Sequence, residues 1–263
     1  MKLDWNQIAE VAGTAVDVLR NHFVFESISS TNDWHAWSGG SNELPAVCLA
    51  ECQDSGRGRN GKAWVSLPDE NIYLTLVWSF KKSCGINLAG LSLAVGVVIA
   101  RLVSGYGEQA KLKWPNDVMV GNSKLAGILI ETKITNTGSI IAIIGIGLNF
   151  SLSAASRQQI NRHVTDFVTG CVSAQCPDRN QLAGMLIKAL VDCCQQYAVH
   201  GFNQFRDQWQ AYDMCMGRVV NIKDASGEWS GTAQGINEQC ALIVMRDNVE
   251  HVVHAADVSI KVE

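Results

Sequence analysis

The spacing of apolar residues divides the chain into helices and strands. Helical spacing over residues 5–20, 86–104 and 181–213 predicts three helical regions. Alternating or continuous apolar runs predict strands at His22–Ile28, Ala46–Glu51, Asn71–Phe80, Lys111–Trp114, Lys124–Glu131 and Ser139–Ile146. The last of these runs is apolar on both faces, which indicates a central strand of a sheet. Residues 151–180 are polar and show no clear period.

Short β runs with turn residues between them begin at Gly217, and this change of pattern predicts a small barrel. The predicted runs are Val219–Ile222, Gly231–Ile236, Cys240–Met245 and His251–Ala255. The sequence therefore predicts two domains, 1–216 and 217–263. The fold class is α+β, with a mixed sheet and a small all-β domain.

Composition narrows the class of protein. The chain has 263 residues, is 47% hydrophobic and carries a formal net charge of −4, so any positively charged site has to be local. This charge also argues against a broad DNA-binding surface. The apolar run Leu88–Val103 is interrupted by Gly90 and Arg101, which suits a packed helix better than a membrane span. The start, Met-Lys-Leu-Asp, lacks the layout of a secretory signal, so we expect a cytoplasmic protein.

The nine cysteines are odd in number and irregularly spaced. Neither Cys48 and Cys52 nor Cys171 and Cys176 are accompanied by a second pair at zinc-binding spacing. We therefore expect reduced thiols that pack as small hydrophobic side chains, and we assign no residues to a metal site.

The glycine-rich segment Gly56–Gly61, Gly-Arg-Gly-Arg-Asn-Gly, formally matches the dinucleotide fingerprint. That interpretation requires a helix directly after the glycines, whereas the pattern at Ile72–Trp78 predicts a strand. What remains is a backbone that can approach an anion and two guanidinium groups suited to carboxylate or phosphate. A solvated basic hairpin loop is the alternative.

Three further clusters carry polar groups at the ends of predicted strands. Lys113–Asp117, Lys-Trp-Pro-Asn-Asp, is either a plain turn or a rigid mount for active-site groups, and Lys124 either reaches solvent or points at an anion. Gly145–Asn149 is either the glycine-rich end of a buried strand or a place where a planar ligand can lie against the backbone. Ser30-Thr31-Asn32 either caps a helix that carries Trp34 and Trp37 or binds a polar, uncharged ligand head.

Taken together, these motifs resemble those of biotin–protein ligases. Ser-Thr-Asn is followed by Glu51-x-Gln53-x-x-Gly-Arg-Gly-Arg-x-Gly-x-x-Trp64, by Lys-Trp-Pro-Asn-Asp, by Lys-Leu-Ala-Gly-Ile-Leu-Ile-Glu131 and by Gly-Ile-Gly-Leu-Asn149, in the family's order and spacing. The resemblance covers residues 23–150 closely and the rest in general layout.

The resemblance implies a catalytic domain related to class II aminoacyl-tRNA synthetases and a small SH3-like barrel. It also implies a two-step reaction, in which ATP and biotin give biotinyl-5′-AMP and a lysine of a biotin carboxyl carrier protein then takes the biotin. Mg²⁺ is the expected metal, brought with ATP. The oligomeric state stays open, with a homodimer as one alternative.

Residue roles follow from the resemblance as expectations. Lys124 would bridge the carboxylate and the α-phosphate, Arg59 would clamp the phosphates, and Asp117 would orient a metal or accept the lysine proton. The implied biotin contacts are Ser30, Thr31, Asn32, Gln53, Arg57, Gly58, Arg59, Lys124 and Gly127. The implied ATP and adenylate contacts are Arg57, Arg59, Trp64, Asn116, Lys124, Gly147 and Asn149.

Two differences from the family limit how far its properties can be carried over to this chain. About two dozen residues precede the first motif strand, so we expect the monofunctional form without an N-terminal DNA-binding domain. No tryptophan lies between Trp114 and Trp209 to stack on adenine, and His163 or Val164 is near the corresponding place. The rival interpretations are a lipoate ligase or octanoyltransferase of the same fold, and a non-catalytic biotin sensor or repressor.

Overall fold

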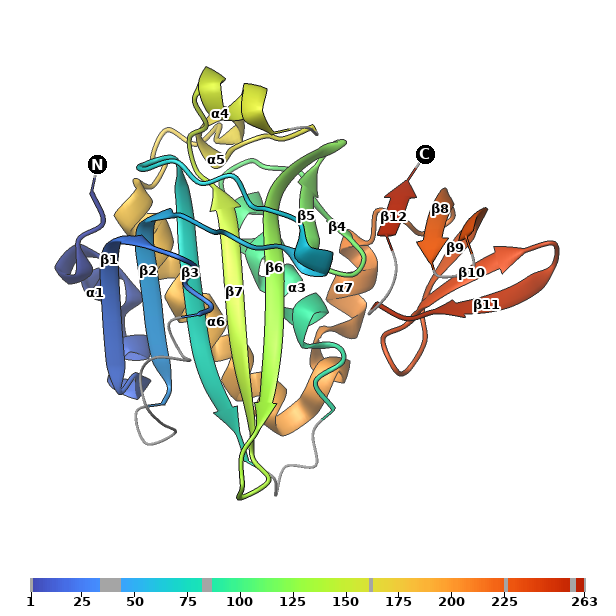
Figure 1. Cartoon of the computed structure of the whole chain (residues 1–263), viewed down its shortest axis with the longest axis horizontal. Coiled ribbons are helices and arrows are strands. Elements are labelled where there is room, and N and C mark those ends of the chain that lie inside the picture. Colours follow the sequence, from blue (N-terminus) through green and yellow to red (C-terminus); the bar gives the residue numbers. More distant parts are fainter. Residues whose placement is uncertain are drawn as a thin grey trace.

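The computed structural model describes residues 2–33, 44–81, 87–160, 163–224, 227–255 and 259–262. A seven-stranded sheet with helices on one face forms the larger part, and a five-stranded sheet forms the C-terminal part (Figure 1). The strands of the large sheet are β1 (Asn21–Ile28), β2 (Ala46–Gln53), β3 (Asn71–Phe80), β4 (Ala110–Lys113), β5 (Asp117–Val120), β6 (Ser123–Ile134) and β7 (Ile140–Asn149). The helices are α1 (Trp5–Ala12), α3 (Leu91–Ser104), α4 (Ala154–Gln159), α5 (Phe167–Gly170), α6 (Arg179–His200) and α7 (Arg206–Tyr212), with 3₁₀ turns η1 (Gly13–Val18), η3 (Arg59–Gly61) and η5 (Gly201–Phe205).

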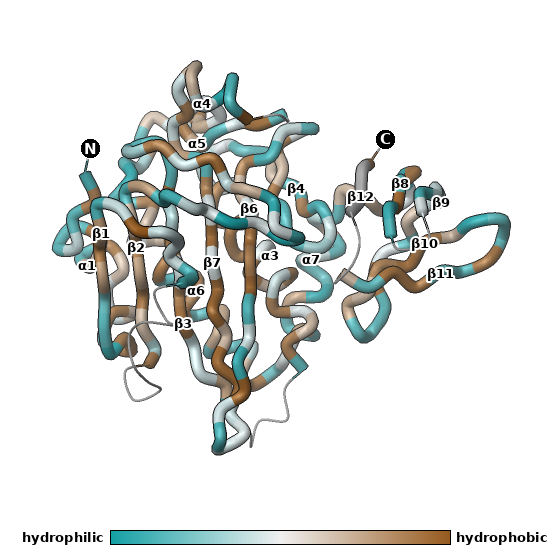
Figure 2. The backbone as a smooth tube through the Cα atoms, in the orientation of Figure 1, coloured by the Kyte–Doolittle hydropathy of each residue, from teal (hydrophilic) through white to brown (hydrophobic). Residues whose placement is uncertain are grey.

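The large sheet has the strand order β1-β2-β3-β7-β6-β5-β4. β1 and β2 are parallel and every other neighbouring pair is antiparallel, so the sheet is mixed, as predicted. β7 lies in the middle of this order, which confirms the central strand expected from its apolar run. Figure 2 shows the hydrophobic residues along the central strands.

The two faces of this sheet differ in what covers them. On one face, Leu74 of β3 and its cross-strand partner Ile146 of β7 belong to the main core, together with the apolar sides of α3 and α6. Side chains alternate between faces along a strand, so Thr75 and its partner Gly145 point the other way. The helices therefore cover one face, and the small residues of β3, β6 and β7 remain for the other.

Local sequence explains where the helices begin and end. Helix α6 starts with a capping box, in which the Asp178 carboxylate accepts from the Gln181 backbone N–H and the Gln181 side chain accepts from the Asp178 N–H. The helix predicted over residues 5–20 is α-helical only to Ala12, because Gly13 adopts a φ of 58° and a 3₁₀ turn follows.

The C-terminal sheet has the order β11-β10-β9-β8-β12. Its strands are β8 (Val219–Asp224), β9 (Gly227–Ile236), β10 (Leu242–Arg246), β11 (Val249–Val253) and β12 (Ser259–Val262). The sequence pattern predicted four of them and missed β12. The predicted domain boundary at residue 216 falls between the end of α7 and the start of β8. The Trp114 indole N–H donates to the Cys240 carbonyl at 3.0 Å, joining the two parts.

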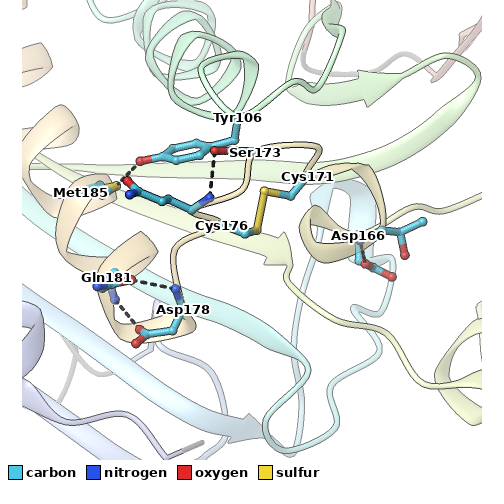
Figure 3. Close-up of a disulfide and its surroundings, with 10 residues drawn as sticks. Tyr106, Asp166, Cys171, Ser173, Cys176, Asp178, Gln181 and Met185 are labelled. Atoms are coloured by element: carbon cyan, nitrogen blue, oxygen red, sulfur yellow. Dashed lines mark hydrogen bonds between the residues drawn. A yellow bond between two sulfur atoms is a disulfide. The ribbon is translucent and has the colours of Figure 1, made fainter.

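Two expectations need correction. The segment between the predicted strands Lys111–Trp114 and Lys124–Glu131 was expected to be a turn, but it contains the short strand β5, which begins inside the Lys-Trp-Pro-Asn-Asp motif. Cys171 and Cys176 form a disulfide, so the expectation of reduced thiols was wrong for this pair (Figure 3). The spacing of five residues gave no signal for it, because the pairing depends on how the chain folds back between α5 and α6. Cys48, Cys52, Cys193, Cys194, Cys215 and Cys240 are free thiols.

The helix expected after Asn32, with Trp34 and Trp37, lies outside the described residues. In the part of the chain that is described, no helix is long and apolar enough to span a membrane.

Candidate active site

A cavity of about 560 Å³ lies on the sheet face that the helices leave uncovered. Its floor is made of glycines at matched register: Gly127 of β6 pairs with Gly147 of β7, and Leu129 pairs with Gly145. Because glycine has no Cβ, these positions leave the backbone of two central strands open to whatever lies above. The connection from β2 to β3, residues 54–70, crosses in front of the sheet at this level (Figure 1).

The Gly/Arg-rich segment of this connection folds back on itself, and we call residues 56–64 the arm. The Gly58 N–H donates to the Lys62 carbonyl at 2.6 Å, and the Trp64 N–H donates to the Gly56 carbonyl at 2.8 Å. At the tip, Asn60 and Gly61 have φ values of 55° and 69°, which the Asn-Gly pair adopts readily. No helix follows the arm before β3, so rejection of the dinucleotide-fingerprint interpretation is confirmed.

Trp64 returns from the arm onto the glycine floor. A Cβ at Gly147 would lie 2.6 Å from its indole ring, and a Cβ at Gly127 would lie 2.8 Å from it. The Lys124 ammonium stands 5.2 Å from the ring centroid. The indole nitrogen is buried without a hydrogen-bond partner among the described residues. Gly147, which was predicted to contact ATP, and Gly127, which was predicted to contact biotin, therefore both face a tryptophan ring in this structure.

A hydroxyl and amide cluster forms one end of the cavity. The Gln53 side-chain oxygen accepts from the Thr31 N–H at 2.8 Å and is 3.1 Å from the Thr31 hydroxyl. Thr75 lies beneath, with its hydroxyl 2.8 Å from both the Thr31 hydroxyl and the Asn32 amide oxygen. Ser30, Thr31 and Asn32 are all buried. This end offers uncharged donors and acceptors held in fixed positions.

Asn32 differs from its neighbours because its amide is engaged inward. Its nitrogen donates to the Glu131 carboxylate at 2.9 Å and lies 3.4 Å from the Leu129 carbonyl, while its oxygen faces Thr75. A Cβ on Gly145 would come within 2.2 Å of that oxygen. The amide therefore occupies the space that this glycine leaves. Asn32 lines the cavity, but its hydrogen-bonding groups support the cluster from below.

Cations gather at the other end of the cavity. The Lys124 ammonium contacts the Asp117 carboxylate at 2.5 Å, and both side chains are largely buried. Arg59 is 3.4 Å from the Asn116 amide oxygen, and its second terminal nitrogen is buried without a hydrogen-bond partner in the described part of the chain. Burial lowers the pKa of Arg59 from its ordinary value, and the nearby Asp117 carboxylate opposes that shift. The group stays charged and has donor capacity for an anion.

Charge in the lining is strongly one-sided. Five lysines and arginines line the cavity: Arg57, Arg59, Lys62, Lys113 and Lys124. Asp117 is the one carboxylate among the described lining residues. A chain with a net charge of −4 thus concentrates positive charge in one pocket, which suits an anionic ligand.

The backbone of Lys124 is held from both sides. Its N–H donates to the His163 carbonyl and its carbonyl accepts from the Thr165 N–H, both at 3.0 Å. The Asn149 side-chain nitrogen donates to the Lys124 and Thr165 carbonyls at 3.1 and 2.9 Å. Asn149 is buried and lies outside the cavity lining. Its contact with ATP stays a prediction, and in this structure its side chain holds the Lys124 backbone.

The structure brings together every other predicted site residue in this one cavity. They are Ser30, Thr31, Asn32, Gln53, Arg57, Gly58, Arg59, Trp64, Asn116, Asp117, Lys124, Gly127 and Gly147. Sequence reasoning missed Thr75, which supports the polar end, and the lining residues Met119, Asn122 and Val262. Glu131 ends one of the motifs but was given no role, and it supports the polar end through Asn32. Thr75 gave one usable signal, a hydroxyl within an otherwise apolar strand.

Among the described residues, no group of three or more His, Cys, Asp or Glu side chains is placed to hold a metal ion. The donor set at the cationic end fits Mg²⁺ only as Mg²⁺ usually binds with nucleotides, through substrate phosphates and one carboxylate. Asp117 is the residue that would supply this carboxylate.

Comparison with known proteins agrees with this geometry. Residues 24–149 match the Biotin/lipoate A/B protein ligase family, and residues 216–261 match the biotin protein ligase C-terminal domain. The bifunctional ligase/repressor BirA of Escherichia coli (strain K12) is 30% identical over 227 residues, covering 86% of this chain and 70% of that protein. The biotin–[acetyl-CoA-carboxylase] ligase of Paracoccus denitrificans is 29% identical over 219 residues, covering 81% and 89%.

A solved structure, biotin protein ligase from Aquifex aeolicus in complex with biotin and ATP, superposes with a TM-score of 0.76. It shares 20% sequence identity and covers 93% of this chain and all of that one, so it supports the fold. The fold and the matches define the class as a two-domain ligase of the biotin/lipoate type. The chain belongs to the biotin protein ligase family.

Proposed function

We propose that the chain activates biotin with ATP and transfers it to a lysine of a biotin carboxyl carrier protein. The observation that carries this proposal is the composition of the cavity, in which uncharged polar groups gather around Thr31 and Gln53, while the cations Lys124 and Arg59 lie near Asp117. Biotin has an uncharged ureido ring at one end and a carboxylate at the other, so it matches this arrangement in polarity and in direction.

The first step brings together two anions. An oxygen of the biotin carboxylate attacks the α-phosphorus of ATP, and the bond to the bridging oxygen of pyrophosphate breaks. Lys124 and Arg59 offset the repulsion between the anions and the charge that develops at phosphorus. Such electrostatic stabilisation usually contributes more to catalysis than any other single effect. Asp117 is the carboxylate that would hold a Mg²⁺ ion brought with ATP, and such an ion would supply further charge neutralisation.

In the second step, the lysine nitrogen attacks the carbonyl carbon of biotinyl-5′-AMP and AMP leaves. The amine has to lose a proton, and we propose Asp117 as its acceptor, since it is the one carboxylate among the described lining residues. The arm lies over the floor and would keep water from the mixed anhydride until the acceptor arrives.

Biotin is favoured over lipoate by the polar end. The ureido group has two N–H donors and a carbonyl acceptor, whereas a dithiolane ring has none of these. The Gln53 oxygen is an acceptor in this cluster, the Thr31 hydroxyl lies within hydrogen-bond distance of Gln53 and Thr75, and the Ser30 hydroxyl can donate or accept. A site built to hydrogen-bond a polar head rejects an analogue that leaves its buried groups unpaired.

The test is pyrophosphate release by the purified chain with MgATP and either biotin or lipoate, followed by transfer to a purified carrier domain. We expect release and lysine labelling with biotin only. Pyrophosphate release with lipoate and none with biotin would show that lipoate is the substrate. Release with neither would contradict the proposed reaction. The homodimer, the cytoplasmic location and the absence of DNA binding stay predictions.

A further inference from the structure

Glu131 connects the sheet to the arm, although it lies outside the cavity lining. It follows Leu129 on the same face of β6, and its cross-strand partner is Ile143. One oxygen of its carboxylate accepts from the Asn32 amide at 2.9 Å and lies 3.6 Å from the Arg57 guanidinium. A single acidic group thus contacts both the support of the polar cluster and a cation of the arm.

The two contacts differ in exposure and therefore in strength. Asn32 is buried, with its amide fixed between Leu129, Thr75 and Glu131. The Arg57 side chain is 44% exposed and has a second partner, Asp33, at 2.5 Å. The hydrogen bond from Asn32 to Glu131 helps to fix the Asn32 side chain over Gly145. The ion pairs of Arg57 with Glu131 and Asp33 instead fix the position of the arm relative to the sheet. Exposed ion pairs of this kind contribute little to stability, so their effect should be on the position of the arm.

We propose that Glu131 is a positioning residue for biotin binding. It couples the Ser30–Asn32 turn, where the ureido ring would bind, to the arm that closes over the ligand, and it does this through Asn32 and Arg57. The inference rests on the proposed function, because it takes from that proposal the direction in which biotin lies in the cavity. It assigns Glu131 no contact with substrate, so we expect replacement of Glu131 to change biotin affinity and the position of the arm more than kcat.

Three variants separate the contacts. Glu131→Gln keeps an oxygen that can accept from Asn32 but removes the charge that faces Arg57. Asp33→Asn removes the other charge facing Arg57 and leaves Asn32 untouched. Glu131→Ala removes both contacts and leaves the buried Asn32 amide with one acceptor fewer. Glu26→Gln is the matched control, because Glu26 forms an exposed ion pair with Lys2.

The measurements are biotin affinity by calorimetry, the KM for biotin and kcat at saturating ATP, and the rate of trypsin cleavage after Arg59 and Lys62 with biotin bound. We expect Glu131→Gln and Asp33→Asn each to weaken biotin binding about two- to five-fold and to speed cleavage, with kcat within about two-fold of wild type. Glu131→Ala should weaken binding roughly ten-fold or more. Glu26→Gln should match wild type throughout.

Two results would overturn the inference: biotin affinity and cleavage rates in both Glu131 variants equal to wild type, or losses confined to kcat. Calorimetry also separates this failure from that of the proposed function. If the wild-type chain binds no biotin, the proposed function fails and this inference with it. If wild type binds biotin and the Glu131 variants bind equally well, only the positioning role fails.

Discussion

Replacement of Gly145 by alanine tests the floor of the cavity in atomic detail. The added Cβ would lie 2.2 Å from the Asn32 amide oxygen and 2.8 Å from its carbon, well inside contact distance. Asn32 cannot easily turn aside, because it is held by Leu129, Glu131 and Thr75. The variant must therefore either expel the amide from its site or displace the central strand β7.

The magnitude follows from what the amide loses. Three hydrogen bonds at about 0.5–1.5 kcal/mol each, or overpacking at about 1–3 kcal/mol, give a destabilisation of about 1–4.5 kcal/mol. For a chain of this size that is a fall in Tm of roughly 2–18 °C. Because Asn32 supports the Thr31 hydroxyl through Thr75, we expect biotin affinity to fall by about ten-fold or more.

A double-mutant cycle makes the prediction refutable. Asn32→Ala should itself destabilise the chain, but it clears the space, so adding Gly145→Ala should then cost less than about 0.5 kcal/mol. Chemical denaturation gives the free energies of unfolding, and calorimetry gives biotin affinity for each variant. Additive losses from the two substitutions would show that the amide and the glycine do not compete for the same space.

Three further outcomes are expected. Arg59→Gly should release biotinyl-5′-AMP early and label bystander lysines, checked by mass spectrometry; unchanged acceptor selectivity would contradict the clamping role. Asn149→Ala should leave the Lys124 and Thr165 carbonyls without their amide donor, costing about 1–3 kcal/mol in the free energy of unfolding and lowering the rate of pyrophosphate release more than biotin affinity. Equal losses in rate and affinity would contradict a role confined to the Lys124 strand. Cys171→Ser should lower the free energy of unfolding by about 2 kcal/mol under oxidising conditions and leave it unchanged under reducing ones, since the disulfide closes a short loop. The same loss under both conditions would point to packing of the thiol instead.

Most strands of the large sheet could be predicted because their apolar runs are long and buried. Ser139–Ile146 indicated a central strand, and β7 is central. Some short elements and local breaks were missed. β5 has four residues, and the break after Ala12 depends on the backbone angle at one glycine.

The site was predictable from the order of its motifs, whereas the roles of its inner supports were not. Thr75 and Glu131 act through register: Thr75 lies opposite Gly145, and Glu131 lies two residues beyond Leu129 on the same face. No local pattern reveals which strands will be neighbours. The floor glycines indicate room for a planar ligand when the sequence is considered alone, but in this structure the space is filled by the side chains of Trp64 and Asn32.

The most direct measurement is biotin-dependent pyrophosphate release by Lys124→Ala compared with wild type, with biotin affinity measured on the same samples. Lys124 lies with Arg59 and Asp117 at the cationic end, and loss of one such charge-stabilising donor typically costs about 10²–10³-fold in rate. We predict a loss of at least this size with biotin affinity reduced far less, because the proposed contacts of the ureido ring are with the Ser30–Asn32 cluster and not with Lys124. Pyrophosphate release within about ten-fold of wild type by a folded Lys124→Ala variant would contradict the central claim, which is that these cations stabilise the reaction between the biotin carboxylate and ATP in this cavity.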